Sequence, residues 1–353
     1  MSLNRFNVFL TADFYDDQGQ SKFSDIGLSQ FTDQPQIQLS TFVEHRAEIA
    51  ADQLAEAQGV IVLTPRVSRE SLESSENVLA VGRFGVGYDT VDVEACTDAD
   101  VVLFIAKGAV DRPVAEATVG WMIALTHHFR AKDQLVRSGQ WDERTKFNGC
   151  ELRDRTLGII GMGGIGSEVV RLLNGFAMRP PIAFDPYCDP VVAGQLGVRL
   201  VELDELLQTA DFVSLHCPLS DGTRDLIGEQ QLALMKPDAY LLNTARGGIV
   251  NEDALYEALK QNKIAGAALD CFVDEPVTRP HRFGELENIL LAPHSVAWTH
   301  EMFRDIGMAS CQGMVDLSLG RVPHGVVNTS VLQRDSFRDK WRRLTGLEPA
   351  ASV

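Results

Sequence analysis

The stretch "GIIGMGGIGSEVV", residues 158–170, decides the fold because its glycines follow G-x-G-x-x-G spacing. The pattern alone is weak, since glycine turns are common, but here it follows an apolar run and opens an apolar-periodic helix. Gly161 allows a tight turn, Gly163 lets a pyrophosphate approach the backbone, and Gly166 lets helix and strand pack closely. The stretch therefore predicts a strand–turn–helix unit that binds dinucleotide phosphates at the helix N-terminus.

Short β-branched runs alternate with amphipathic stretches on both sides of this turn, which is typical of parallel α/β sheets. The first series of runs predicts a flavodoxin-like unit of five strands, with a helix expected over residues 44–58. The second series predicts a Rossmann-type sheet of six strands. The expected strands cover residues 7–12, 36–40, 59–64, 78–82 and 101–105, and then residues 156–161, 182–185, 211–217, 239–245, 265–270 and 289–294.

Two long helical patterns, over residues 113–138 and 299–319, would carry the chain from one domain to the other and back. We therefore expect an α/β protein of two doubly wound parallel-sheet domains with a cleft between them. Residues 1–113 and 301–330 should form a flavodoxin-like substrate domain, and residues 114–300 a Rossmann domain.

The composition excludes several classes of protein. The chain has 353 residues, with 32 Lys and Arg against 49 Asp and Glu and a formal net charge of -17, which repels nucleic acid. No apolar run approaches the roughly 18 residues that span a bilayer. The six cysteines lie far apart without a C-x-x-C pair, so we expect reduced thiols and no metal site in a soluble, cytoplasmic protein. Residues 331–353 are expected to be a C-terminal tail, and the locally basic residues 334–353 within it an exposed terminal helix.

Asp185 ends the strand after the glycine turn, 19 residues beyond Gly166. A carboxylate there can accept both hydroxyls of an adenosine ribose and would repel a 2′-phosphate. Neither Pro186 nor Tyr187 supplies an arginine to hold such a phosphate. The alternative is a surface aspartate in an Asp-Pro turn, but the upstream glycines favour NAD as the cofactor.

Polar residues follow the ends of three later strands, namely Arg246, Asp270 with Glu275 after it, and His294. His294 closes the apolar run "LLAPH", and a lone histidine in such a place is usually structural. Arg246 could likewise lie in a surface loop, and Glu275 in a simple turn. Because ligands of doubly wound sheets bind at the carboxyl ends of the strands, the four side chains can instead converge on one site.

Longer segments carry a resemblance to a known family. They include "GRFGVGYDTVDVEACTDADVV" (82–102), "ELRDRTLGIIGMGGIG" (151–166), "MKPDAYLLNTARGGIVNEDAL" (235–255) and "GAALDCFVDEP" (266–276). Together they resemble the D-2-hydroxyacid dehydrogenases, the D-isomer-specific, NAD-dependent family. Residues 1–77 match that family in pattern only.

The resemblance implies interconversion of a 2-keto acid and a D-2-hydroxy acid with NAD as the cofactor. Arg246 would clamp the substrate carboxylate and polarise the keto oxygen, which suits its planar, always-charged guanidinium. His294 would act as acid and base, giving a proton to that oxygen as hydride reaches the carbon. Glu275 would hydrogen-bond the far nitrogen of the imidazole and stabilise its protonated form.

The resemblance also assigns binding contacts. Asp270 would hold the nicotinamide carboxamide, while the backbone at Val86 and Gly87, with Arg83 nearby, would bind the substrate from the first domain. A homodimer formed through the NAD domain is expected from the family alone. The implied cofactor contacts are Gly161, Gly163, Gly164, Ile165, Gly166, Asp185, Cys217, Pro218, Thr244, Ala245, Arg246 and Asp270.

Some positions depart from the family pattern. Gly164 stands where most members have arginine, so a side chain that could contact the pyrophosphate is absent. Ala297 and Trp298 replace two small residues, and Trp298 could trim the pocket, as in D-lactate dehydrogenases, or pack in the core. Arg83 and residues 141–149 instead resemble phosphoglycerate dehydrogenases. The substrate stays open among glyoxylate or hydroxypyruvate, 3-phosphoglycerate and a D-lactate-like acid.

A competing function is a non-enzymatic NAD(H)-binding regulator, because the family includes co-repressors that bind this cofactor. Such a sensor can lose its catalytic residues, whereas this chain keeps Arg246, Glu275 and His294 together. Formate dehydrogenases, another branch, pair their histidine with glutamine, so Glu275 argues against that branch. The sequence therefore favours an NAD-dependent oxidoreductase.

Overall fold

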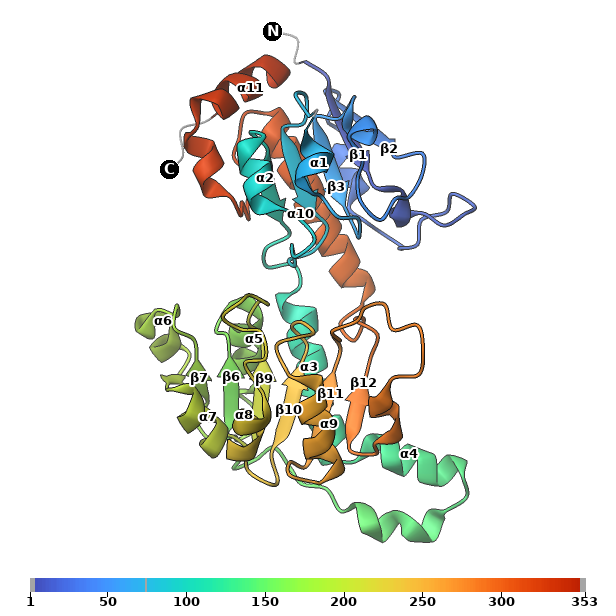
Figure 1. Cartoon of the computed structure of the whole chain (residues 1–353), viewed down its shortest axis with the longest axis vertical. Coiled ribbons are helices and arrows are strands. Elements are labelled where there is room, and N and C mark those ends of the chain that lie inside the picture. Colours follow the sequence, from blue (N-terminus) through green and yellow to red (C-terminus); the bar gives the residue numbers. More distant parts are fainter. Residues whose placement is uncertain (1–3, 74, 350–353) are drawn as a thin grey trace. The chain divides into compact units, whose positions relative to one another are not determined.

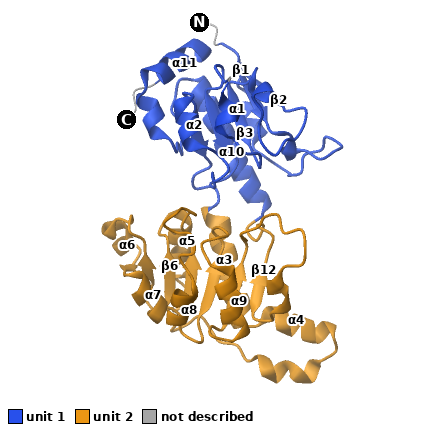
Figure 2. Ribbon diagram, in the orientation of Figure 1, with its two compact units in different colours: residues 1–110, 298–353 blue, residues 111–297 orange. Residues whose placement is uncertain are grey.

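The computed structural model describes residues 4–73 and 75–349. The chain divides into two compact units (Figure 2), with boundaries after Val110 and after Ala297. Unit 1 contains the described residues up to Val110 and those from Trp298 onward, and unit 2 contains Asp111–Ala297. The helices α3 (Asp111–Thr126) and α10 (His300–Ser318) lie beside these boundaries.

Unit 1 is built on a parallel sheet of five strands in the order β2-β1-β3-β4-β5. This is the flavodoxin-like order that the sequence predicts. The strands are β1 (Phe6–Leu10), β2 (Ile37–Thr41), β3 (Gly59–Val62), β4 (Ala80–Arg83) and β5 (Val102–Ile105). Between them lie α1 (Arg69–Leu72), α2 (Val93–Asp98) and the 3-10 segments η1 (Ala12–Phe14), η2 (Leu28–Phe31) and η3 (Ala51–Leu54).

The helix expected over residues 44–58 does not form. Its amphipathic pattern yields only η3, because the preceding backbone pairs with residue 66. The N–H of Ile49 donates to the Arg66 carbonyl at 2.9 Å, and the N–H of Arg66 donates to Ala47 at 2.9 Å. These extended contacts override a helical propensity, which is a weak preference per residue.

The C-terminal residues correct a second expectation. Instead of an exposed tail helix, α11 (Asp335–Thr345), which follows η6 (Thr329–Gln333), packs into unit 1. Phe337 and Trp341 are fully buried, and the indole nitrogen of Trp341 donates to the Leu317 carbonyl at 3.0 Å. The basic residues of the segment occupy the other faces of an amphipathic helix. Their positive charge therefore does not indicate that the whole helix is exposed.

Unit 2 holds a parallel sheet of seven strands in the order β12-β11-β10-β9-β6-β7-β8 (Figure 1). The order is that of a Rossmann fold with one strand added at the β12 edge. The sequence predicts six of these strands and misses β8, which has only two residues and therefore no periodicity to detect. The strands are β6 (Leu157–Ile160), β7 (Ile182–Phe184), β8 (Arg199–Leu200), β9 (Phe212–Leu215), β10 (Tyr240–Asn243), β11 (Gly266–Leu269) and β12 (Ile289–Leu291).

Helices cover both faces of the seven-stranded sheet, as a parallel sheet requires. One apolar core includes side chains of α7 (Leu203–Thr209), α8 (Glu229–Leu234) and α9 (Glu252–Lys260). The other includes side chains of α3, α5 (Gly164–Leu173) and α6 (Pro190–Gln195). None of the helices in the described ranges is long and apolar enough to cross a membrane.

The single helix expected over residues 113–138 is two helices, α3 and α4 (Phe129–Arg137). Between them His128 adopts the left-handed conformation, with φ 54°. In a continuous helix the Thr126 carbonyl would accept from residue 130, but here it accepts from the N–H of Cys150 at 3.0 Å. The segment after η4 (Trp141–Phe147) thus caps α3, a long-range contact that the local sequence does not reveal.

Candidate active site

The turn between β6 and α5 needs its first and third glycines. Gly161 has φ 97°, and a Cβ built there would lie 2.7 Å from the backbone nitrogen of Cys217. A Cβ on Gly166 would lie 2.3 Å from the Gly161 carbonyl oxygen. Real side chains do not tolerate such approaches, so these two glycines permit the crossing of α5 over the sheet edge.

The middle of the turn is open. A Cβ built on Gly163, the N-cap of α5, would meet no atom within 4 Å, which leaves room for a phosphate group beside the helix N-terminus. Ile165, two residues further along the chain, is half-buried. The neighbouring position differs, because a Cβ on Gly164 would lie 2.0 Å from Oδ2 of Asp111. The first residue of α3 therefore places a carboxylate where the resemblance leads one to expect arginine.

Asp185 follows β7 and connects that strand to the glycine turn. Its Oδ2 accepts from the N–H of Met162 at 2.8 Å, and its Oδ1 accepts from the N–H of Tyr187 at 2.9 Å. A carboxylate offers about four acceptor positions, so two backbone donors leave capacity for ribose hydroxyls. The Asp-Pro turn and a ribose-binding role are thus compatible.

The next strands add to the same edge of the sheet, since β9 pairs with β6 and β10 pairs with β9. Cys217 and Pro218 follow β9, and burial raises the pKa of the Cys217 thiol to about 11. Thr244 and Ala245 follow β10, where Thr244 Oγ1 lies 3.4 Å from Thr118 Oγ1 of α3. All four positions therefore lie at the carboxyl ends of strands in the sheet that bears the glycine turn.

Asn243 shapes the turn that carries Arg246, a role that the sequence analysis missed. Its side chain is 2% exposed, and its Oδ1 accepts from the N–H of Ala245 at 3.0 Å. Its Nδ2 donates to the Arg246 carbonyl at 2.8 Å, while the Arg246 guanidinium donates to the Ala245 carbonyl at 2.6 Å. An amide at the end of an otherwise apolar strand was the available signal, because buried polar side chains are normally hydrogen-bonded.

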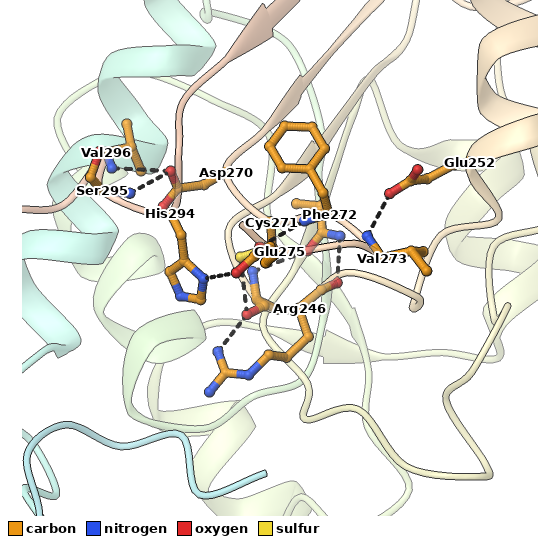
Figure 3. Close-up of polar contacts among 12 residues, drawn as sticks. Arg246, Glu252, Asp270, Cys271, Phe272, Val273, Glu275, His294, Ser295 and Val296 are labelled. Carbon is orange, nitrogen blue, oxygen red and sulfur yellow. Dashed lines mark hydrogen bonds and ion pairs between the residues drawn. The ribbon is translucent and has the colours of Figure 1, made fainter. Parts of the chain in front are cut away.

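His294 and Glu275 form a direct pair (Figure 3). Nδ1 of His294 lies 2.7 Å from Glu275 Oε2, and Glu275 Oε1 accepts from the N–H of Phe272 at 2.8 Å. The imidazole is 49% exposed, so it is not a core residue, and the pairing of Nδ1 leaves Nε2 to meet a ligand. The backbone of His294 has φ 53°, a strained conformation for a non-glycine residue of the kind that clusters at functional sites.

The electrostatics favour a charged pair. The side chains of Cys271 and Glu275 raise the pKa of His294 to about 10, although burial acts in the opposite direction. Burial acts to raise the pKa of Glu275, but the hydrogen bonds from His294 and the Phe272 backbone bring it below its ordinary value. At neutral pH the pair is therefore an imidazolium and a carboxylate.

Asp270 holds the histidine loop, residues 294–296, through hydrogen bonds. Its carboxylate follows β11, is 5% exposed, and accepts through Oδ1 from the N–H groups of Ser295 at 2.9 Å and Val296 at 3.1 Å. Its carbonyl accepts from the N–H of His294 at 2.8 Å. Burial raises the pKa of Asp270, and these amide donors act against the rise. Asp270 therefore positions His294, whatever else it binds.

The other predicted residues lie in unit 1. Arg83 ends β4 and donates to the carbonyls of Val62, at 3.4 Å, and Phe84, while Val86 and Gly87 are half-buried in the loop that follows. Trp298 packs edge-on against Phe303 with ring centroids 5.2 Å apart and still leaves 58% of its surface exposed. It is thus an aromatic contact of unit 1 with an open face.

Residues 119–296 match the model of the D-isomer specific 2-hydroxyacid dehydrogenase NAD binding domain. The chain is 40% identical over 264 residues to D-3-phosphoglycerate dehydrogenase of Methanocaldococcus jannaschii, covering 74% of this chain and 50% of the relative. It is 34% identical over 279 residues to glyoxylate reductase of Thermococcus litoralis, covering 77% and 84%. D-lactate dehydrogenase of Escherichia coli superposes with a TM-score of 0.73 at 25% identity, over 91% of this chain and all of that one.

The chain therefore belongs to the D-isomer specific 2-hydroxyacid dehydrogenase family, and unit 2 corresponds to the NAD-binding domain of that family. It spans about half the length of the phosphoglycerate dehydrogenases that it matches. The glyoxylate reductases are covered over more than four fifths of their length.

Proposed function

We propose that the protein interconverts a small 2-keto acid and the corresponding D-2-hydroxy acid with NAD as the cofactor. The observation that carries the proposal is the His294–Glu275 pair, whose Nδ1 and Oε2 lie 2.7 Å apart after two strands of the sheet that bears the glycine turn. A sensor would need the cofactor turn but not an acid–base pair with a strained, hydrogen-bonded histidine. Family membership supports the same assignment.

The residues of unit 2 suit the reaction. The turn at residues 161–166 and Asp185 would hold NAD, which supplies or accepts the hydride when bound. Nε2 of His294 gives a proton to the substrate oxygen in reduction and removes it in oxidation. Glu275 holds the imidazole through Nδ1 and stabilises its charge, and Arg246 binds the substrate carboxylate.

We propose NAD in preference to NADP because of Asp185. Its carboxylate, fixed by Met162 and Tyr187, brings a negative charge that would repel a 2′-phosphate at the ribose position.

We also propose that the loop of Arg83, Val86 and Gly87 contacts the substrate. A Gly87→Ala change should then raise KM for the keto acid more than it lowers kcat.

NADH oxidation with a panel of 2-keto acids tests the proposal. The panel contains glyoxylate, hydroxypyruvate, pyruvate and 3-phosphohydroxypyruvate, because the curated relatives are phosphoglycerate dehydrogenases and glyoxylate reductases. At least one acid should give saturable turnover that yields the D-hydroxy acid. NADH binding without turnover of any acid would contradict the proposal and favour a regulator.

We further propose that the protein is a homodimer formed through unit 2 and works in a reducing, cytoplasmic compartment. All six cysteines are free in the structure, which suits such a compartment. Sedimentation of the purified protein should give twice the monomer mass of 38.8 kDa, and a monomer would contradict the first part.

A further inference from the structure

Cys271 places a third potential metal ligand beside the acid–base pair. Its Sγ, a nitrogen of His294 and an oxygen of Glu275 all lie within 4.8 Å of one another. The thiol is 2% exposed and donates to the Ala245 carbonyl at 3.4 Å, so it faces the two other groups from the protein interior (Figure 3). The three side chains come from the loops that follow β11 and β12.

We propose that Cys271, Glu275 and His294 form an inhibitory binding site for Zn²⁺. The ion takes the place of the proton that lies between His294 and Glu275. The inhibition rests on the proposed dehydrogenase function, whereas the binding itself does not.

The donor set is one that zinc selects. Thiolate sulfur, imidazole nitrogen and carboxylate oxygen are its ordinary ligands, and sites that leave a fourth position open commonly use three protein ligands. Tetrahedral bonds of ordinary length to sulfur and nitrogen put those two atoms about 3.6 Å apart. The three donor atoms, which lie within 4.8 Å of one another, are therefore already close to the spacing that the ion needs.

Access and charge favour the ion. The imidazole of His294 is 49% exposed and the carboxylate of Glu275 is 33% exposed, so a cation approaches from their side and meets the thiol behind them. Binding releases two protons, that of the Cys271 thiol and that of the His294 imidazolium on Nδ1. It leaves two negative ligands around the ion, with the Asp270 carboxylate in the next layer. Arg246, whose charge lowers the pKa of Glu275, is a cation that repels the metal ion.

Inhibition follows from the nitrogen that the metal uses. Nδ1 pairs with Glu275, so an ion that replaces their shared proton binds Nδ1. With a metal on Nδ1 the ring can carry a proton on Nε2 only as neutral imidazole, and it no longer becomes an imidazolium. The group that gives a proton to the substrate is then lost while the cofactor turn is untouched.

Metal titration of the cofactor-free protein tests the binding. Calorimetry with Zn²⁺ and the ultraviolet cadmium–thiolate absorption with Cd²⁺ should each report one site. Cys271→Ser should abolish the absorption and weaken Zn²⁺ binding about a hundredfold or more, since even outer partners of metal ligands are worth about 10- to 100-fold. Glu275→Gln, which keeps the thiol and its packing, should weaken binding with the absorption retained.

Cys150→Ser removes a half-buried thiol of the same unit and should leave both signals unchanged. One-site binding with an undiminished absorption in Cys271→Ser would overturn the proposal, as would the lack of any site in the native protein. With an active keto acid, Zn²⁺ should lower kcat and leave the affinity for NADH unchanged. A protein that binds Zn²⁺ at Cys271 but turns over no keto acid would instead contradict the proposed function alone.

Discussion

The two halves of the site in unit 2 are built by different means. The glycine turn at residues 161–166 depends on missing side chains, because Cβ atoms at Gly161 and Gly166 would collide with nearby backbone. The histidine loop depends on bonds between residues far apart in sequence, such as Asp270 with Val296 and Glu275 with His294. The first half is therefore visible as a local motif, whereas the second exists only once β11 and β12 are paired.

The largest effect on kcat should come from a change in the histidine loop. His294→Ala removes the proton donor, so kcat for keto-acid reduction should fall on the order of a hundredfold or more. NADH affinity, measured by fluorescence titration, should stay nearly unchanged because the imidazole lies outside the glycine turn. A variant that keeps a tenth or more of the native kcat would remove His294 from the mechanism.

The first half can be broken by adding one methyl group. In Gly166→Ala the new Cβ would lie 2.3 Å from the Gly161 carbonyl, so the free energy of unfolding should fall by about 1–3 kcal/mol. NADH affinity should fall roughly tenfold or more, since the turn must shift away from the phosphates. In Gly175→Ala the methyl group meets no atom within 4 Å, and this matched control should leave both quantities unchanged.

Asp185 tests which cofactor the first half selects. Asp185→Ser removes the charge that repels a 2′-phosphate. The ratio of kcat/KM with NADH to kcat/KM with NADPH should therefore fall roughly tenfold or more. The wild-type protein should prefer NADH. A native preference for NADPH would show that the carboxylate has only the structural role of joining Met162 and Tyr187.

The smallest effect on NADH affinity should come from Asp111, whose carboxylate lies beside Gly164 at the start of α5. A negative charge there competes with a pyrophosphate for the helix N-terminus and repels it. Asp111→Asn should tighten NADH binding roughly two- to fivefold, the range expected for one charge at a helix end. Glu116→Gln, an exposed charge change on the same helix, should not alter the affinity; equal tightening in both variants would make the effect one of net charge.

The sequence predicts the strand series of both sheets well, because buried parallel strands are continuous apolar runs. It fails where long-range contacts decide local structure. The pairing with Arg66 prevents the helix at 44–58, and Cys150 takes the carbonyl that a continuous helix at 113–138 would need.

The site shows the same division. The carboxyl ends of strands mark Arg246, Asp270 and His294 as candidates, but their partners follow from the tertiary structure alone. Asn243 ends the apolar run of β10, and Cys271 follows Asp270, so a polar or sulfur side chain next to an apolar run was the only signal. Asp111 lies far from Gly164 in sequence, so its approach to the turn could not be predicted.

The pH dependence of Glu275→Gln tests the central claim most directly, that His294 is an acid tuned by Glu275. Reduction needs the imidazolium, so its rate should be lost as pH rises through the raised pKa of His294, and its optimum should lie below that for oxidation. Glutamine keeps the shape and one hydrogen bond but removes the charge. In the variant the profile of kcat/KM for keto-acid reduction should therefore move to lower pH, with NADH affinity unchanged. A profile that coincides with that of the wild-type protein would contradict the account.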